Sequence, residues 1–151
     1  MKDKVVLGLT IGLFADLVKL MTNYIGHLLK FTDVLFWQIA ATRFLEKSDL
    51  NKPVAYLVGG FADLAVAALM GVIFIYLLYF TGRDYAYIKG VGFGIIVWVA
   101  LFGTVLGQSV QNKLTLNSTA ILVTAIAHLS FGAALAFFAL KFSSNKSDTC
   151  F

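Results

Sequence analysis

Long apolar runs separated by short polar segments dominate the chain. Four of these runs predict membrane-crossing helices, over residues 5–29, 54–80, 86–107 and 118–140. Each run exceeds or approaches the ~20 residues that a helix needs to cross ~30 Å of hydrocarbon. The pattern therefore predicts an all-α polytopic membrane protein, in which residues 1–151 form a single transmembrane helical domain.

Residues 33–47 follow a different pattern, apolar on one side and polar on the other. Four apolar side chains fall on one helical face: Val34, Trp37, Ala41 and Phe44. Thr32 or Asp33 is a suitable N-cap. A segment of about 15 residues is too short to cross a bilayer, so we expect an amphipathic helix in the membrane interface. A docking surface for another subunit is the alternative interpretation.

The composition agrees with a membrane protein. Hydrophobic residues make up 60% of the chain and charged residues 13%, whereas soluble domains have about 45–50% and about 25%. The net charge of +4 comes from residues near the ends of the spans. No Lys/Arg cluster is long enough to follow a nucleic-acid backbone, so the expected partner is the lipid bilayer. The slight excess of basic residues on the side of the termini favours cytoplasmic termini.

Polar residues interrupt the first span. At 100° per residue, Asp16, Asn23 and His27 fall within about 20° of one line on the helix, and Lys19 lies about 60° away. Such a face is unfavourable in contact with lipid, because an ionised group at the bilayer centre costs at least ~2.5–3.5 kcal/mol. We therefore expect this face to point at partner helices or water.

Two other spans carry polar residues at a similar depth. Asp63 lies about 10 residues into the second span and His128 about 10 residues into the fourth. The predicted buried polar cluster therefore has six members: Asp16, Lys19, Asn23, His27, Asp63 and His128. Residues 11–17 and 58–64 are also identical at five of seven positions, including the aspartate. Consecutive spans run antiparallel, so this similarity is what an inverted-topology repeat would produce.

Three interpretations of the polar cluster remain open. It can hold helices in register through buried charges and hydrogen bonds. It can form a proton or ion pathway or a polar substrate site. It can contact another subunit. Three Gly-x3-Gly patterns, at Gly8–Gly12, Gly90–Gly94 and Gly103–Gly107, favour close helix packing within the chain, with homo-oligomer formation as the alternative.

Sequence motifs of several enzyme and cofactor classes are missing. The chain has no phosphate-binding loop, His-Glu-x-x-His or nucleophile elbow, and its single cysteine, Cys150, excludes a paired-cysteine motif. We therefore expect no enzymatic activity, metal or cofactor. His27 and His128 differ in depth by ~10 Å or more, which disfavours one haem held by both. Quinone binding needs few polar groups and stays open.

The last span contains His128, Leu129 and Gly132 in a His-Leu-x-x-Gly pattern. This pattern and the four-span layout resemble small bacterial four-helix membrane proteins of the YqhR-like and YagU-like kind. The resemblance implies a bacterial plasma membrane and no particular activity. We expect a small non-enzymatic membrane protein that handles protons or small ions, alone or in a complex. The alternatives are a structural or assembly subunit and a quinone- or haem-binding electron-transfer subunit.

Overall fold

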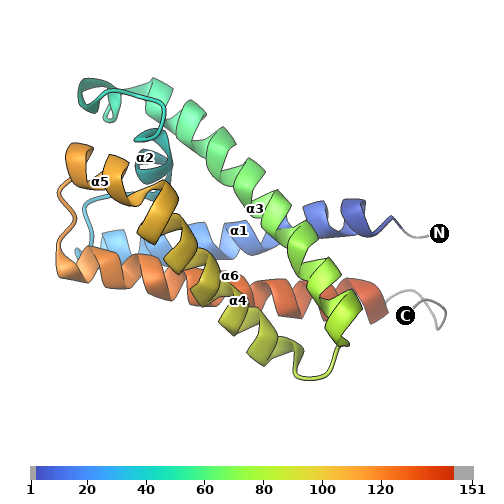
Figure 1. Cartoon of the computed structure of the whole chain (residues 1–151). Helices are drawn as coiled ribbons and strands as arrows, with labels where there is room; N and C mark the ends of the chain where they lie inside the picture. Colours follow the sequence, from blue (N-terminus) through green and yellow to red (C-terminus); the bar gives the residue numbers. More distant parts are fainter. Residues whose placement is uncertain (1–2, 145–151) are drawn as a thin grey trace.

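The computed structural model describes residues 3–144, which form helices joined by short segments (Figure 1). Four helical stretches are long and apolar enough to cross a membrane: α1 (Lys4–Leu28), α3 (Pro53–Thr81), α4 (Ala86–Ala100) with its continuation η2 (Leu101–Val105), and α6 (Ser118–Ser144). The short helices are α2 (Phe36–Ala41), η1 (Lys47–Asp49) and α5 (Gly107–Lys113). The predicted all-α polytopic class is confirmed. Cys150 lies outside the described residues.

The long helices are arranged as two packed pairs. Helix α3 packs on α1, α4 packs on α6, and α1 and α6 lie side by side between them, whereas α3 and α4 scarcely touch. Helix α1 begins and α6 ends at the same end of the bundle (Figure 1), as an even number of crossings requires. Large apolar side chains such as Leu57, Phe61 and Phe80 are exposed on the outer faces, where they suit contact with lipid.

Glycines bring the helices of each pair into backbone contact. A Cβ atom on Gly71 of α3 would collide with backbone atoms of Gly8 and Gly12 in α1. In the other pair, Gly132 of α6 lies against the backbone of Gly90. Two of the three Gly-x3-Gly patterns therefore serve close packing within the chain.

The third pattern, at Gly103–Gly107, does not pack two helices together. A Cβ on Gly103 would meet no atom of residues 3–144 within 4 Å. The helix instead widens into the π-helical segment η2, in which the Leu106 N–H donates to the Leu101 carbonyl at 2.7 Å. The third membrane-crossing stretch therefore ends at Thr104 rather than at residue 107, and Gly107 begins the separate helix α5.

Helix α2 is shorter than the predicted helix over residues 33–47, and its N-cap is Leu35 rather than Thr32 or Asp33. The first turn of α2 is held by a residue of another helix, because Asn23 of α1 accepts a hydrogen bond from the Phe36 N–H at 3.1 Å. At the other end, the Lys113 ammonium donates to the carbonyls of Thr42 and Leu45. A longer helix would use the Thr42 carbonyl for the N–H four residues further on.

The apolar face predicted for this segment is also divided differently. Phe36 and Ile39 are the large side chains that α2 buries, together with Ala41. Phe44, assigned to the same face by the sequence pattern, lies beyond the end of α2 and is 63% exposed. The position of this segment in the membrane interface stays a prediction.

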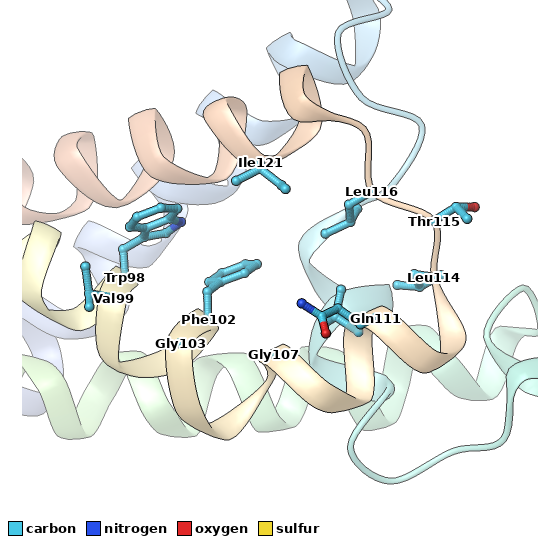
Figure 2. Close-up of a pocket in the computed structure, with 11 residues that line it drawn as sticks. Trp98, Val99, Phe102, Gly103, Gly107, Gln111, Leu114, Thr115, Leu116 and Ile121 are labelled. Carbon is cyan, nitrogen blue, oxygen red and sulfur yellow. The ribbon is translucent and has the colours of Figure 1, made fainter.

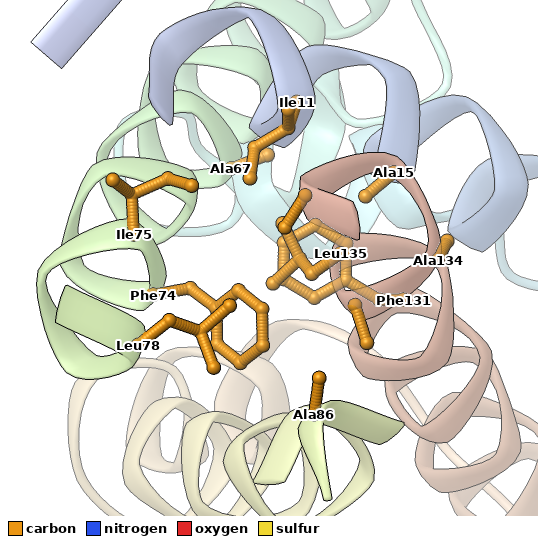
Figure 3. Packing of buried hydrophobic residues seen from close by; sticks show 12 residues of the cluster. Ile11, Ala15, Ala67, Phe74, Ile75, Leu78, Ala86, Phe131, Ala134 and Leu135 are labelled. Atoms are coloured by element: carbon orange, nitrogen blue, oxygen red, sulfur yellow. The ribbon is translucent and has the colours of Figure 1, made fainter. Parts of the chain in front are cut away.

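The two larger of the buried apolar clusters border the polar residues, since Lys19 lies against Phe131 of one cluster and Phe36 of the other. The larger cluster joins all four long helices and includes Ile11, Phe74, Ala86, Phe131 and Leu135 (Figure 3). The second lies nearer the short helices and joins Phe36, Ile39, Val110 and Ala127. The candidate site lies between these two apolar regions.

Candidate functional site

Lys19 is held between two carboxylates where α1 meets α3. Its Nζ lies 2.6 Å from Oδ1 of Asp16 and 2.6 Å from Oδ1 of Asp63. The side chains of Asp16, Lys19 and Asp63 are 0%, 6% and 13% exposed. We call these three residues the Asp–Lys–Asp triad. It brings together three of the six residues predicted to form the polar cluster.

The glycine contact between α1 and α3 explains why the two aspartates meet. Gly12 lies against the backbone of Ala67. Asp16 follows Gly12 by one helical turn, and Asp63 precedes Ala67 by one turn on the antiparallel helix α3. Residues four apart share a helix face, so both aspartates reach the same level of the interface. The repeated sequence segments thus place their aspartates on one lysine.

The triad contains two carboxylates and one ammonium group. With both carboxylates ionised, it carries one negative charge in excess. Oδ2 of Asp16 and Oδ2 of Asp63 are buried and accept no hydrogen bond from the described residues. The Phe36 ring centroid lies 4.8 Å from the Lys19 Nζ and the Phe131 centroid 5.8 Å from it, so the ammonium gains further stabilisation from aromatic faces.

A small cavity connects the triad with His128. Its volume is about 20 Å³, and Lys19, Asp63 and His128 are its charged or titratable lining residues. A buried water needs about 10–15 Å³ and two to four polar partners. The cavity therefore has the size and the polarity to hold one water molecule between the triad and His128.

His128 has a fixed tautomer when its ring is neutral. Its Nδ1 lies 2.8 Å from the Thr124 carbonyl, which can only accept, so Nδ1 carries the proton and Nε2 is the acceptor. The Phe36 and Phe102 rings meet the imidazole edge-on, with centroids 5.4 and 6.0 Å away. His128 is thus a buried imidazole with one nitrogen left to accept a proton.

Among the described residues, Asn23 and His27 hydrogen-bond to backbone groups of the segment that follows α1, and neither is hydrogen-bonded to the triad lysine. Asn23 binds the first turn of α2 through Oδ1, while its Nδ2 has no hydrogen-bond partner among the described residues. His27 is half-buried at the end of α1, and its Nδ1 lies 2.9 Å from the Thr32 carbonyl. Both residues help to shape the turn between α1 and α2.

Sequence reasoning missed two aromatic neighbours of the site. Phe36 contacts both the Lys19 ammonium and the His128 ring, although the helical pattern did not place it on the buried side of its segment. Trp98 donates from Nε1 to the Thr124 hydroxyl at 3.0 Å. The Thr124, His128 and Gly132 spacing marks one face of the fourth span, but a single sequence does not indicate which helix packs there.

The described residues include no group of three or more His, Cys, Asp or Glu side chains that could hold a metal ion. The two histidines have different surroundings, since His27 binds a turn carbonyl and His128 lies among the Phe36 and Phe102 rings. Their arrangement gives no support to a haem held between them.

Neither a family model, a curated protein nor a solved structure matches this chain. The resemblance to small bacterial four-helix membrane proteins therefore stays a prediction based on the last span.

Proposed function

We propose that this integral membrane protein moves protons, with the Asp–Lys–Asp triad as the proton-binding group. The observation that carries the proposal is the buried pairing of two aspartates with one lysine, at 2.6 Å each. A neutral ion pair would need only one aspartate. The second carboxylate gives the site a group that can take up and release a proton.

Burial favours protonation of the Asp–Lys–Asp triad, because the triad otherwise carries an uncompensated negative charge. An excess charge at the bilayer centre costs at least ~2.5–3.5 kcal/mol. Protonation of one carboxyl removes that charge, and two carboxylates in one site commonly share a single proton. The unpartnered Oδ2 atoms of Asp16 and Asp63 are the atoms that can receive it.

His128 extends the proposed path beyond the triad. A water molecule in the 20 Å³ cavity would adjoin both Asp63 and His128. We assign to His128 the role of the next proton acceptor, through Nε2. A small cation is the alternative cargo, because it would also balance the second carboxylate. We place the protein in a bacterial plasma membrane with cytoplasmic termini.

A structural or assembly subunit is the second candidate function. The observation that favours it is that Lys19 and Asp63 join two different helices, so the same ion pair fixes α1 against α3. In that case the triad holds the bundle together, alone or with other subunits, and moves no ions.

Proton flux in reconstituted vesicles tests the proposal. The protein is placed in phosphatidylcholine–phosphatidylglycerol vesicles with a pH-sensitive dye inside, and flux is measured after a pH step. Asp16→Asn leaves a neutral Lys19–Asp63 pair and removes the second carboxylate. We expect this variant to fold and its proton flux to fall on the order of 10²-fold, the usual effect of losing a proton-transfer group.

The exposed pair Asp49–Lys52 provides a matched control. It has the same i,i+3 spacing and the same 2.6 Å distance as Asp16–Lys19, but lies at the surface. Asp49→Asn should leave the flux unchanged. Wild-type flux that persists in a folded Asp16→Asn variant would refute the proposal. No flux of H⁺, Na⁺ or K⁺ in any variant would favour the structural subunit.

A further inference from the structure

A large pocket opens where α6 separates from the third span. Helices α4 and α6 are in backbone contact at Gly90 and Gly132, and towards the other end η2 and α5 diverge from the start of α6. The pocket between them has a volume of about 540 Å³ (Figure 2). This lies in the ~300–1,000 Å³ range of small-molecule sites.

We propose that this pocket binds a neutral lipid-like amphiphile, with one hydrocarbon chain inside and its uncharged polar head at Gln111. Apolar side chains form most of the lining: Trp98, Phe102, Val110, Leu114, Leu116 and Ile121. Figure 2 shows Phe102 and Ile121 pointing into one space from opposite walls. Such a lining suits a hydrocarbon chain.

The described lining residues carry no charge, which favours an uncharged head group on the ligand. Among the residues that the structure describes, no Lys, Arg, Asp, Glu or His lines the pocket. Lys113 lies close by in α5, but its ammonium donates to the carbonyls of Thr42 at 3.0 Å and Leu45 at 2.8 Å. A phosphate or carboxylate head would therefore lack a cationic partner that balances its charge. The Gln111 amide can both donate to and accept from a neutral head.

The two ends of the pocket match the two ends of an amphiphile. At the inner end the rings of Trp98 and Phe102 stack, with centroids 6.0 Å apart, and Thr124 already occupies the Trp98 Nε1. That end therefore presents apolar ring surface. The outer end is formed by Gln111 and the 114–116 segment, between two membrane-crossing helices and thus near the level of the lipid headgroups.

Two features of η2 keep the pocket open. Gly103 lies in its wall, and a Cβ there would meet nothing within 4 Å. The π-helical turn shifts the following residues out of the α-helical register, so that α5 leaves the line of α4. π-Helical turns occur frequently at functional sites. A leucine at position 103 would extend into the space that the chain of the amphiphile is proposed to occupy.

Quenching of Trp98 fluorescence tests the proposal. Trp37→Phe leaves Trp98 as the single tryptophan. The protein is reconstituted in phosphatidylcholine vesicles with increasing amounts of a monoacylglycerol whose chain carries bromine, a contact quencher. A fatty acid with the same brominated chain is the anionic comparison, and the unbrominated lipids give the reference intensity.

We expect saturable quenching by the monoacylglycerol, with half-saturation at a mole fraction roughly 2–10-fold lower than for the fatty acid. This ratio corresponds to one head-group hydrogen bond. Gln111→Leu should remove the preference. Gly103→Leu should abolish saturable quenching, and Ile121→Phe should weaken it from the opposite wall.

Gly92→Leu is the matched control, because Gly92 also has nothing within 4 Å of its Cβ position but does not line the pocket. It should leave the quenching unchanged. Equal, non-saturable quenching by both brominated lipids would overturn the proposal and show contact with bulk lipid only. Competition by decyl-benzoquinone, another neutral single-chain amphiphile, would support the class and identify a quinone as the preferred ligand. Without such competition, saturable quenching assigns a glyceride.

Discussion

The ammonium nitrogen of Lys19 lies 2.6 Å from Oδ1 of Asp63, a residue 44 positions further along the chain on helix α3. Asp16 approaches the same nitrogen from within α1 at 2.6 Å. Lys19 therefore has one carboxylate partner on its own helix and one on the neighbouring helix. The contact with Asp63 therefore joins two helices, whereas the contact with Asp16 lies within α1 and adds the second negative charge.

Removal of Lys19 should destabilise the protein more than removal of either aspartate. Lys19→Met leaves two buried carboxylates without a cation, and we expect a loss of about 3–5 kcal/mol in the free energy of unfolding. Asp16→Asn keeps a one-to-one ion pair and should cost less. The triple variant Asp16→Asn, Lys19→Met, Asp63→Asn has no buried charge and should be more stable than Lys19→Met alone. Denaturant unfolding in detergent measures each value.

Lys52 of the exposed Asp49–Lys52 pair provides the control for the effect of Lys19→Met on stability. Lys52→Met removes a surface partner of Asp49 and should change stability by no more than about 1 kcal/mol. Equal effects of Lys19→Met and Lys52→Met would contradict the buried triad.

A methyl group on Gly71 should disrupt the α1–α3 contact. Gly71→Ala places its Cβ against the backbone of Gly8 and Gly12, and overpacking of this kind costs about 1–3 kcal/mol. Gly60→Ala on the same helix meets nothing within 4 Å, so it should be neutral or stabilise by about 0.5–1 kcal/mol. Thermal unfolding of the two variants should separate them, and the close contact would be excluded if both behaved alike.

Asn23 should stabilise the first turn of α2 rather than take part in proton movement. Asn23→Ala leaves the buried Phe36 N–H without its acceptor, which costs about 1–3 kcal/mol. Hydrogen exchange at the Phe36 amide should accelerate. The control is Asn51→Ala, which removes the exposed acceptor of the Gln38 side-chain amide. It should not alter exchange at the Phe36 backbone amide. Loss of proton flux in a stable Asn23→Ala variant would place Asn23 in the pathway instead.

The segment between α1 and α3 should lie on one side of the membrane. Lys30 follows α1 and Lys52 precedes α3, and both side chains are exposed. After Cys150→Ser, single cysteines at positions 30 and 52 should react with an impermeant maleimide from the same side of sealed vesicles. Labelling from opposite sides would show that residues 31–52 cross the bilayer.

Helical periodicity was sufficient to predict the four long apolar helices and the polar face of α1, because both depend on spacing within one helix. It placed Asp16 and Asn23 on one face, and both are buried. The partner of each residue depends on tertiary structure. Asn23 binds Phe36 because the chain turns back after Thr32, and no pattern within α1 contains that information.

The third long helical stretch ends differently from the predicted span for a related reason. Gly103 and Gly107 have the spacing of a helix-packing motif, yet within the described part of the chain no residue of another long helix lies within 4 Å of a Cβ at either position. Whether another helix packs against two such glycines depends on the path of that helix through the fold. The same holds for α2, whose last turn is limited by Lys113 from a segment 71 positions away.

The two helix pairs meet along a boundary between α1 and α6, which we call the seam. Glycines bind α3 to α1 and α4 to α6 through their backbones, whereas α1 and α6 meet through side chains such as Thr22 and Ser130. Asp63 moves with Lys19, since both belong to one pair, while His128 belongs to the other. Shear along the seam would therefore leave the ion pair intact and alter the gap between Asp63 and His128. The water-sized cavity lies across this seam, because its lining includes Asp63 of one pair and His128 of the other, so relative sliding of the pairs would change its size.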